Sequence, residues 1–68
     1  MINNFSRILG ERLLKISQVS TETEISRTTL TNFYYKRNKN ISYQTLEKIC
    51  DYLEISLSEL LEYEPKKD

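Results

Sequence analysis

The 68-residue chain contains no His, one Cys, one Gly and one Pro, and these absences exclude several classes of protein. A single Cys cannot form an internal disulfide, and without His it cannot build a zinc site of the Cys and His type. The sequence also has no glycine-rich loop, so it offers no recognisable catalytic constellation. We therefore expect neither an enzyme nor a protein that holds a metal ion or another cofactor.

Long apolar segments are also missing, because no uninterrupted apolar run exceeds three residues. A membrane-spanning helix needs about 20 such residues. The first residues, Met1 to Asn4, lack the charged and apolar regions of a secretion signal. We expect a cytoplasmic protein in which residues 1–68 form one domain, with no membrane attachment and no second domain to hold a small-molecule effector.

The ten basic and ten acidic residues cancel overall, but their distribution along the chain is uneven. Residues 25–46 contain four basic residues and no acidic residue, whereas residues 47–68 contain seven acidic residues and three lysines. A basic middle segment can face nucleic-acid phosphates, while an acidic end lies in solvent or influences the choice of partner. Short charged runs also occur on solvated faces that bind nothing.

Apolar residues recur every three or four positions, which is the period of one face of a helix. The first such face, from Phe5 to Leu13 and Ile16, predicts a helix over residues 3–14. No segment alternates as a strand does, so we predict an all-α fold, a compact five-helix bundle. The inward residues of the four later helices are Val19; Leu30 and Phe33; Leu46, Ile49, Cys50 and Leu53; and Leu57, Leu60 and Leu61.

Serines mark the starts of these helices, because a serine hydroxyl accepts hydrogen bonds from the free amides of a first helical turn. The predicted N-caps are Ser17, Ser26 and Ser42, and Ser56 with Glu59 has the spacing of a capping box. The second helix, residues 18–23, and the third, residues 26 to about 35, then flank a short turn closed by Ile25. This arrangement predicts a helix-turn-helix from about Ile16 to Tyr35.

The outer face of the third predicted helix carries polar side chains that suit contact with DNA bases. Arg pairs bidentately with guanine and Asn with adenine in the major groove, and Thr adds methyl or hydroxyl contacts. The alternative is a solvated helix face without a ligand. The residues on this face are Arg27, Thr28, Thr31 and Asn32.

The segment after the third helix is basic and has no apolar residue until Ile41. We expect Lys36, Arg37 and Lys39 to contact DNA phosphates from an exposed loop, although loop lysines can also serve solubility alone. The preceding Tyr34 and Tyr35 are expected to fill or cap the core, each with its hydroxyl at the surface.

The end of the chain has more apolar residues than a short terminal helix needs to bury. Part of this surface is expected to pair with a second copy of the chain, and the alternative is that it closes the core of one copy. The residues of this predicted dimer interface are Leu57, Leu60, Leu61 and Tyr63.

Three stretches carry a family resemblance: ISRTTLTNFYY at residues 25–35, ISYQTLEKICDYL at 41–53 and SELLEY at 58–63. Over roughly residues 8–63 the chain resembles the Cro/repressor-type (XRE-like) helix-turn-helix family of bacterial and phage regulators. The resemblance implies a lambda-repressor-like five-helix domain, DNA binding through the third helix and frequent dimerisation. By motif position it implies base contacts from Arg27, Thr28 and Asn32, a base or phosphate contact from Thr31, and phosphate contacts from Ser17 and Gln18.

The chain departs from the family pattern at the turn between the second and third helices. Ser20 stands where the family commonly has Ala, and Glu24 stands where it commonly has Gly. A left-handed residue with a Cβ costs about 1 to 2 kcal/mol, so either the turn is reshaped or the core carries this cost. The charge of Glu24 also lies where it can repel phosphate.

These observations predict a sequence-specific, double-stranded DNA-binding transcriptional regulator, a repressor that forms a homodimer on a short inverted repeat. The alternative is a protein-interaction module of the same fold, such as an antitoxin or an antirepressor, that has lost operator binding. Glu24 and the acidic end of the chain favour the alternative, and the basic middle opposes it.

Overall fold

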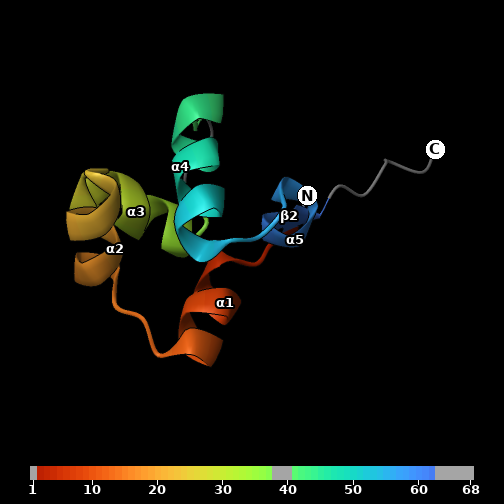
Figure 1. The fold of residues 1–68 in the computed structure, drawn as a ribbon, viewed down its shortest axis with the longest axis horizontal. Helices are drawn as coiled ribbons and strands as arrows, with labels where there is room; N and C mark the ends of the chain where they lie inside the picture. The colour runs from red at the N-terminus through yellow and green to blue at the C-terminus, as the bar shows by residue number, and fades with distance from the viewer. Residues whose placement is uncertain (1, 38–40, 63–68) are drawn as a thin grey trace.

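The computed structural model describes residues 2–37 and 41–62, which form five helices and one pair of short strands. The α2 helix packs against α3 and α4, α1 packs against α3, and α5 packs against α4 (Figure 1). The predicted all-α, five-helix fold is confirmed. The helices are α1 (Phe5–Arg12), α2 (Ile16–Thr23), α3 (Arg27–Tyr34), α4 (Tyr43–Leu53) and α5 (Leu57–Leu60).

The core contains apolar side chains from every helix, because each helix buries one face. Burying a large aliphatic or aromatic side chain stabilises a fold by about 1.5 to 3 kcal/mol, so this cluster is the main source of stability. The Phe5 and Phe33 rings lie 5.0 Å apart between centroids and join α1 to α3. The side chains with at most 1% exposed surface are Phe5, Leu9, Val19, Leu30, Ile49, Leu53 and Leu60.

Two short strands, one near each end of the described residues, pair with each other, and the sequence did not predict them. The β1 strand (Ile2–Asn3) pairs antiparallel with β2 (Leu61–Glu62), with Asn3 opposite Leu61. Two residues are too few to produce a recognisable alternation of apolar and polar positions. The predicted last helix therefore ends at Leu60, and Leu61 belongs to a strand.

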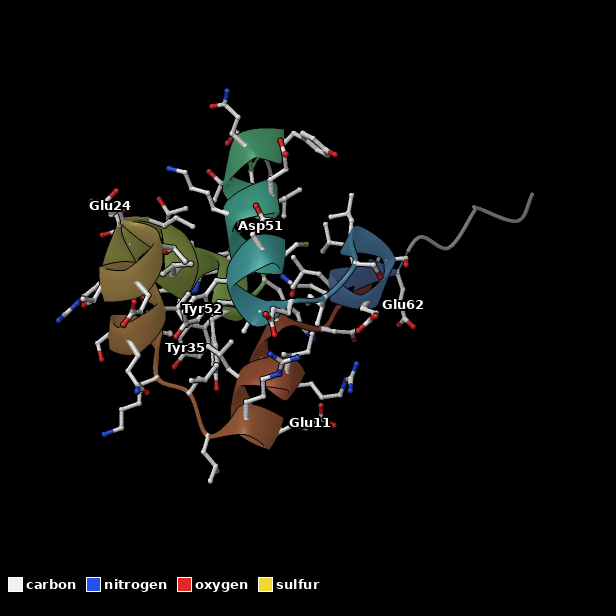
Figure 2. The ribbon with its side chains drawn as sticks, viewed as in Figure 1. Glu11, Glu24, Tyr35, Asp51, Tyr52 and Glu62 are labelled. Carbon is white, nitrogen blue, oxygen red and sulfur yellow. The ribbon has the colours of Figure 1, made fainter. Side chains whose placement is uncertain are left out.

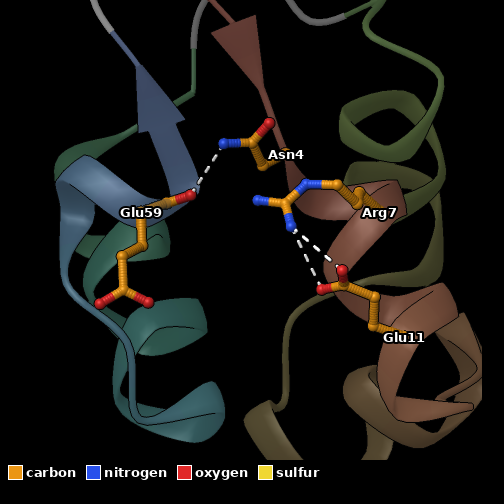
Figure 3. Close-up of polar contacts among 4 residues, drawn as sticks. All are labelled: Asn4, Arg7, Glu11 and Glu59. Carbon is orange, nitrogen blue, oxygen red and sulfur yellow. Dashed lines mark hydrogen bonds and ion pairs between the residues drawn. The ribbon is translucent and has the colours of Figure 1, made fainter.

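Two asparagines fasten this strand pair to the helices. The Asn4 side chain is buried, and its Nδ2 donates to the Glu59 carbonyl oxygen at 3.0 Å (Figure 3). The Asn3 Nδ2 donates to the Phe33 carbonyl oxygen at 2.9 Å, at the end of α3. Because a buried amide needs such partners, the two residues fix the N-terminal strand relative to α3 and α5.

Several helices end at a residue with left-handed backbone. Leu13, Lys36 and Glu54 have φ values of 56°, 61° and 57°, and each lies in the closing turn of α1, α3 or α4. In each case two backbone hydrogen bonds satisfy the last carbonyls, as in a Schellman motif: for α3, Arg37 N donates to Asn32 O and Lys36 N to Phe33 O. Glycine usually fills this position, and here it fills none of the three.

The left-handed turn after α1 corrects one core prediction. Leu13 was expected on the inward face of the first helix, but 87% of its surface is exposed. The helix ends at Arg12, so the left-handed turn directs Leu13 outward and Leu14 packs against the core instead. None of the helices in the described parts of the chain is long and apolar enough to cross a membrane.

Candidate nucleic-acid interface

The start of α3 is fixed by the serine that the sequence indicates. Ser26 has extended backbone, and its Oγ accepts a hydrogen bond from the Thr29 amide at 3.1 Å and donates one to Thr29 Oγ1 at 2.8 Å. The predicted N-cap at Ser26 is confirmed. Because the cap fixes the first turn, it also fixes the direction in which Arg27 and Thr28 leave the helix.

The turn between α2 and α3 has the left-handed geometry that the family pattern requires. Glu24 has φ 62° and ψ 19°, and its amide donates to the Ser20 carbonyl oxygen at 2.9 Å. The Ser20 hydroxyl donates to the Ile25 carbonyl oxygen at 2.7 Å, while the Ile25 side chain is buried. The turn is therefore not reshaped, and Glu24 adopts the conformation that normally favours glycine.

The two faces of α3 differ in the way that a DNA-reading helix requires. Leu30 and Phe33 are buried against the core. Arg27 and Thr28 are exposed, whereas Thr31 and Asn32 are half-buried. The four predicted base-contacting residues thus lie on one helix, with the first two fully available and the other two nearer to the neighbouring elements.

The α2 helix begins earlier than the sequence predicts, and Ser17 is not its N-cap. Lys15 occupies the cap position, and its amide donates to Gln18 Oε1 at 2.9 Å. Ser17 lies inside the first turn of α2 and is half-buried. The Gln18 side chain reaches back to the Lys15 amide, so the cap lies at the residue before Ile16. The amide NH₂ of Gln18 remains a donor that can reach an anion.

Lys15 is a candidate contact residue for which the sequence suggested no role. Its side chain is exposed and stands at the N-terminus of α2, where the helix dipole adds partial positive charge. The detectable signal was a lysine followed by Gln three residues later, which is half of a capping box.

The segment after α3 places two cations at the surface. Lys36 and Arg37 are exposed, and the Arg37 guanidinium carbon lies 5.0 Å from the centroid of the Tyr35 ring. Lys39 lies outside the described residues. Within residues 2–37 and 41–62 the single ion pair joins Arg7 to Glu11 (Figure 3), so no carboxylate neutralises Lys36 or Arg37 there.

The two tyrosines at the end of α3 differ from each other. Tyr34 is half-buried and meets the Phe5 ring edge-on, with 6.3 Å between centroids, as expected for a residue that caps the core. Tyr35 is 58% exposed and does not pack against the core, so the prediction that it fills or caps the core is wrong. It lies beyond the last buried position of α3 and packs against Tyr34 and Arg37 instead.

The predicted dimer interface is only partly available at the surface. Leu60 is 0% exposed, so it belongs to the core of one chain and has no surface to offer a second copy. Leu61 is half-buried in β2, whereas Leu57 is 40% exposed. Tyr63 lies outside the described residues. The Leu60 amide donates a hydrogen bond to the carbonyl oxygen of the cap residue Ser56, and in this turn the Leu60 side chain faces the core.

Comparison with known proteins supports the same interpretation. No curated protein matches the chain. A family model described as the Cro/C1-type HTH DNA-binding domain matches residues 4–66, a segment that includes all five helices. With the capped α3 and the left-handed turn before it, this match shows that the chain belongs to the Cro/C1-type helix-turn-helix DNA-binding domain family.

Proposed function

We propose that the chain is a cytoplasmic transcriptional regulator, a repressor that occupies specific double-stranded DNA with α3 in the major groove. The observation that supports it most is the polar start of α3, where Arg27 and Thr28 are exposed while Leu30 and Phe33 of the same helix are buried. A rigid cap at Ser26 and a packed inner face hold this surface in one orientation.

In this proposal the residues of α3 contact base edges. Arg27 pairs with guanine through its two parallel donors, and Asn32 pairs with adenine through its amide. Thr28 offers a methyl group and a hydroxyl to a neighbouring base. Thr31, which is half-buried, contacts a base or the nearest phosphate.

Residues at the borders of α2 and α3 hold the DNA backbone. Ser17 and Gln18 lie in the first turn of α2, where amide donors and the helix dipole attract phosphate, and Lys15 adds a full charge there. Lys36 and Arg37 extend the cationic surface beyond α3, and we assign Lys39 to the same group. Phosphate contacts position the protein without selecting a sequence.

Two copies are proposed to bind the halves of an inverted repeat, with the DNA bringing them together. Leu60 is buried in the core of one chain, and Leu57 lines the same pocket as the exposed acids Glu47 and Asp51. A two-fold contact through Leu57 would join this acidic patch to the same patch of the second copy, which disfavours a large apolar interface at this position.

Selection from a pool of random duplexes tests the proposed function. We expect enrichment of one short motif, and binding that weakens steeply as salt concentration rises because the cationic residues displace counterions from phosphates. The absence of any enriched motif, together with salt-insensitive or undetectable binding, would contradict the proposal. That result would instead favour the protein-interaction module, for which the acidic surface of α4 and α5 is the supporting observation.

A further inference from the structure

We propose that a groove between α4 and α5 docks a basic, amphipathic helical segment of a partner protein. The groove has a volume of about 230 Å³ and is lined by Tyr43, Glu47, Cys50, Asp51 and Leu57. None of these residues belongs to the α2–α3 surface assigned to DNA. The inference therefore goes beyond the proposed function and does not depend on it.

The apolar side chains of the groove are unusually exposed for their size. Tyr43 is 65% exposed and Leu57 is 40% exposed, and Cys50 forms a buried floor between them. Covering such a side chain is favourable, because it removes apolar surface from water. The groove thus offers two apolar anchors that the fold of one chain leaves uncovered.

The floor of the groove is also uncharged at neutral pH. Burial raises the pKa of the Cys50 thiol, and the negative charges of Asp51 and Glu59 raise it further. The thiol therefore stays protonated and behaves as a small apolar side chain.

The spacing along α4 fits a helical partner. Tyr43, Glu47 and Asp51 are separated by four residues each, so they form one stripe along α4, and Leu57 extends it from the first position of α5. At about 1.5 Å per residue the part of this stripe from Tyr43 to Asp51 is roughly 12 Å long, which matches about two turns of a partner helix lying along it. A helix that presents side chains one turn apart can contact the stripe at each of its positions.

The charge of the groove identifies the kind of partner. Glu47 and Asp51 are both exposed, and neither forms an ion pair within the described residues. The one cation of α4, Lys48, lies about 100° around the helix from Glu47 and about 60° from Asp51, and within the described residues it forms an ion pair with neither acid. Lys or Arg side chains one turn apart on a partner would complement both acids.

The same charges disfavour DNA and a second copy as occupants. DNA phosphates would be repelled by Glu47 and Asp51. A two-fold contact through the groove would join this acidic patch to the same patch of a second copy, a like-charge arrangement that opposes association. A basic segment of a different protein is the occupant that satisfies both the apolar anchors and the acidic rim.

Titration of the full, isotope-labelled chain with a synthetic peptide tests the proposal by NMR. The probe is a helix-forming peptide of about four turns with a leucine stripe flanked by lysines. Two control peptides carry Glu in place of each Lys, or the same residues in an order that destroys the stripe. We expect the lysine peptide to shift the amides of Tyr43, Cys50 and Leu57 selectively, and the two controls to bind at least about tenfold more weakly.

Matched variants of the protein separate docking from general attraction to acidic surfaces. Glu47→Lys with Asp51→Lys should weaken binding of the lysine peptide at least about tenfold. Glu22→Lys, which changes another exposed acid, on α2, should leave the affinity unchanged. Tyr43→Ser with Leu57→Ser should also weaken it, and both altered side chains are exposed enough to leave folding intact.

Three results would overturn the inference. These are no shifts at the groove, equal binding of the lysine and control peptides, and shifts that appear with protein concentration alone, which would make a second copy the occupant. The titration contains no DNA, so its failure would leave the proposed DNA-binding function untouched.

Discussion

Glu24 is the residue whose left-handed backbone conformation most clearly lowers the stability of the fold. Glycine would adopt its left-handed conformation freely, whereas the chain's only glycine, Gly10, lies in the middle of α1, where an added Cβ would meet no atom within 4 Å. The helix-turn-helix therefore contains strain that its buried residues Val19 and Ile25 must offset.

We predict that Glu24→Gly stabilises the protein by about 0.5 to 1 kcal/mol. Relief of the left-handed conformation contributes about 1 to 2 kcal/mol, and the extra freedom of glycine in the unfolded chain takes back about half of that. Denaturant unfolding would measure the change. The control is Glu22→Gly, two residues earlier and inside α2, which should destabilise by about 1 kcal/mol. A loss of stability in both variants would show that Glu24 is not strained.

A second prediction compares two serines that the sequence could not distinguish. Ser26→Ala removes the acceptor for the Thr29 amide and should cost about 1 kcal/mol of unfolding free energy. Ser17→Ala should cost little or nothing, because Ser17 lies within α2 and Ala is the better helix former. Thermal unfolding of the two variants provides the measurement. Equal losses would place the start of α2 at Ser17 after all.

At the scale of whole helices, periodicity and caps predicted most of the fold. Ser26, Ser42 and Ser56 each accept the expected hydrogen bond, from the amides of Thr29, Thr45 and Glu59. The errors occur at the start of α2, which Lys15 caps in place of Ser17, and at the end of α1, where Leu13 occupies a left-handed position that usually contains glycine. Because no glycine marks the end of α1, the sequence does not show where this helix ends. The two-residue strands are too short to produce an alternating pattern.

The candidate interface was predictable where it depends on helix faces and unpredictable where it depends on exact helix starts and ends. The outward position of Thr28 follows directly from the burial of Leu30, because two residues span about 200° of a helix. The N-cap position of Lys15 depends on a hydrogen bond to Gln18, and the burial of Leu60 depends on how α5 is rotated by its cap. Neither follows from a count of apolar residues, since both are set by the local hydrogen bonds of a helix cap.

The prediction for α3 separates sequence recognition from backbone binding. Arg27→Ala or Asn32→Ala should cost about 1 to 3 kcal/mol on the selected duplex and far less on random DNA, because each removes a base contact. Arg37→Ala should weaken all duplexes alike and lower the salt dependence by about one counterion. Titrations at several salt concentrations would provide both values. Equal losses for all three variants on every duplex would reduce α3 to a nonspecific cationic surface.

The whole molecule has two surfaces of opposite charge on different helices. Exposed cations stand at the start of α2 and at both ends of α3, at Lys15, Arg27, Lys36 and Arg37. The elements α4, α5 and β2 carry more exposed acids than cations, with Lys48 as their exposed cation, and Figure 2 shows Asp51 and Glu62 on them. Two exposed acids lie on the other side of this division, Glu22 on α2 and Glu24, which projects from the α2–α3 turn (Figure 2). A protein of zero net charge can therefore still approach DNA in a preferred orientation, because the field near each surface follows its local charge.

This separation of charge also determines how two copies can associate. One domain contacts few base pairs, so useful specificity needs two half-sites about 34 to 36 Å apart on one side of the duplex. We predict a monomer in sedimentation at tens of micromolar without DNA, and two chains bound per inverted-repeat duplex. A duplex with one half-site should bind one chain. Leu57→Glu should leave the two-chain complex unchanged, because Leu57 borders acids instead of a matching apolar surface. A stable dimer without DNA that Leu57→Glu dissociates would instead establish the terminal helix as the dimer interface.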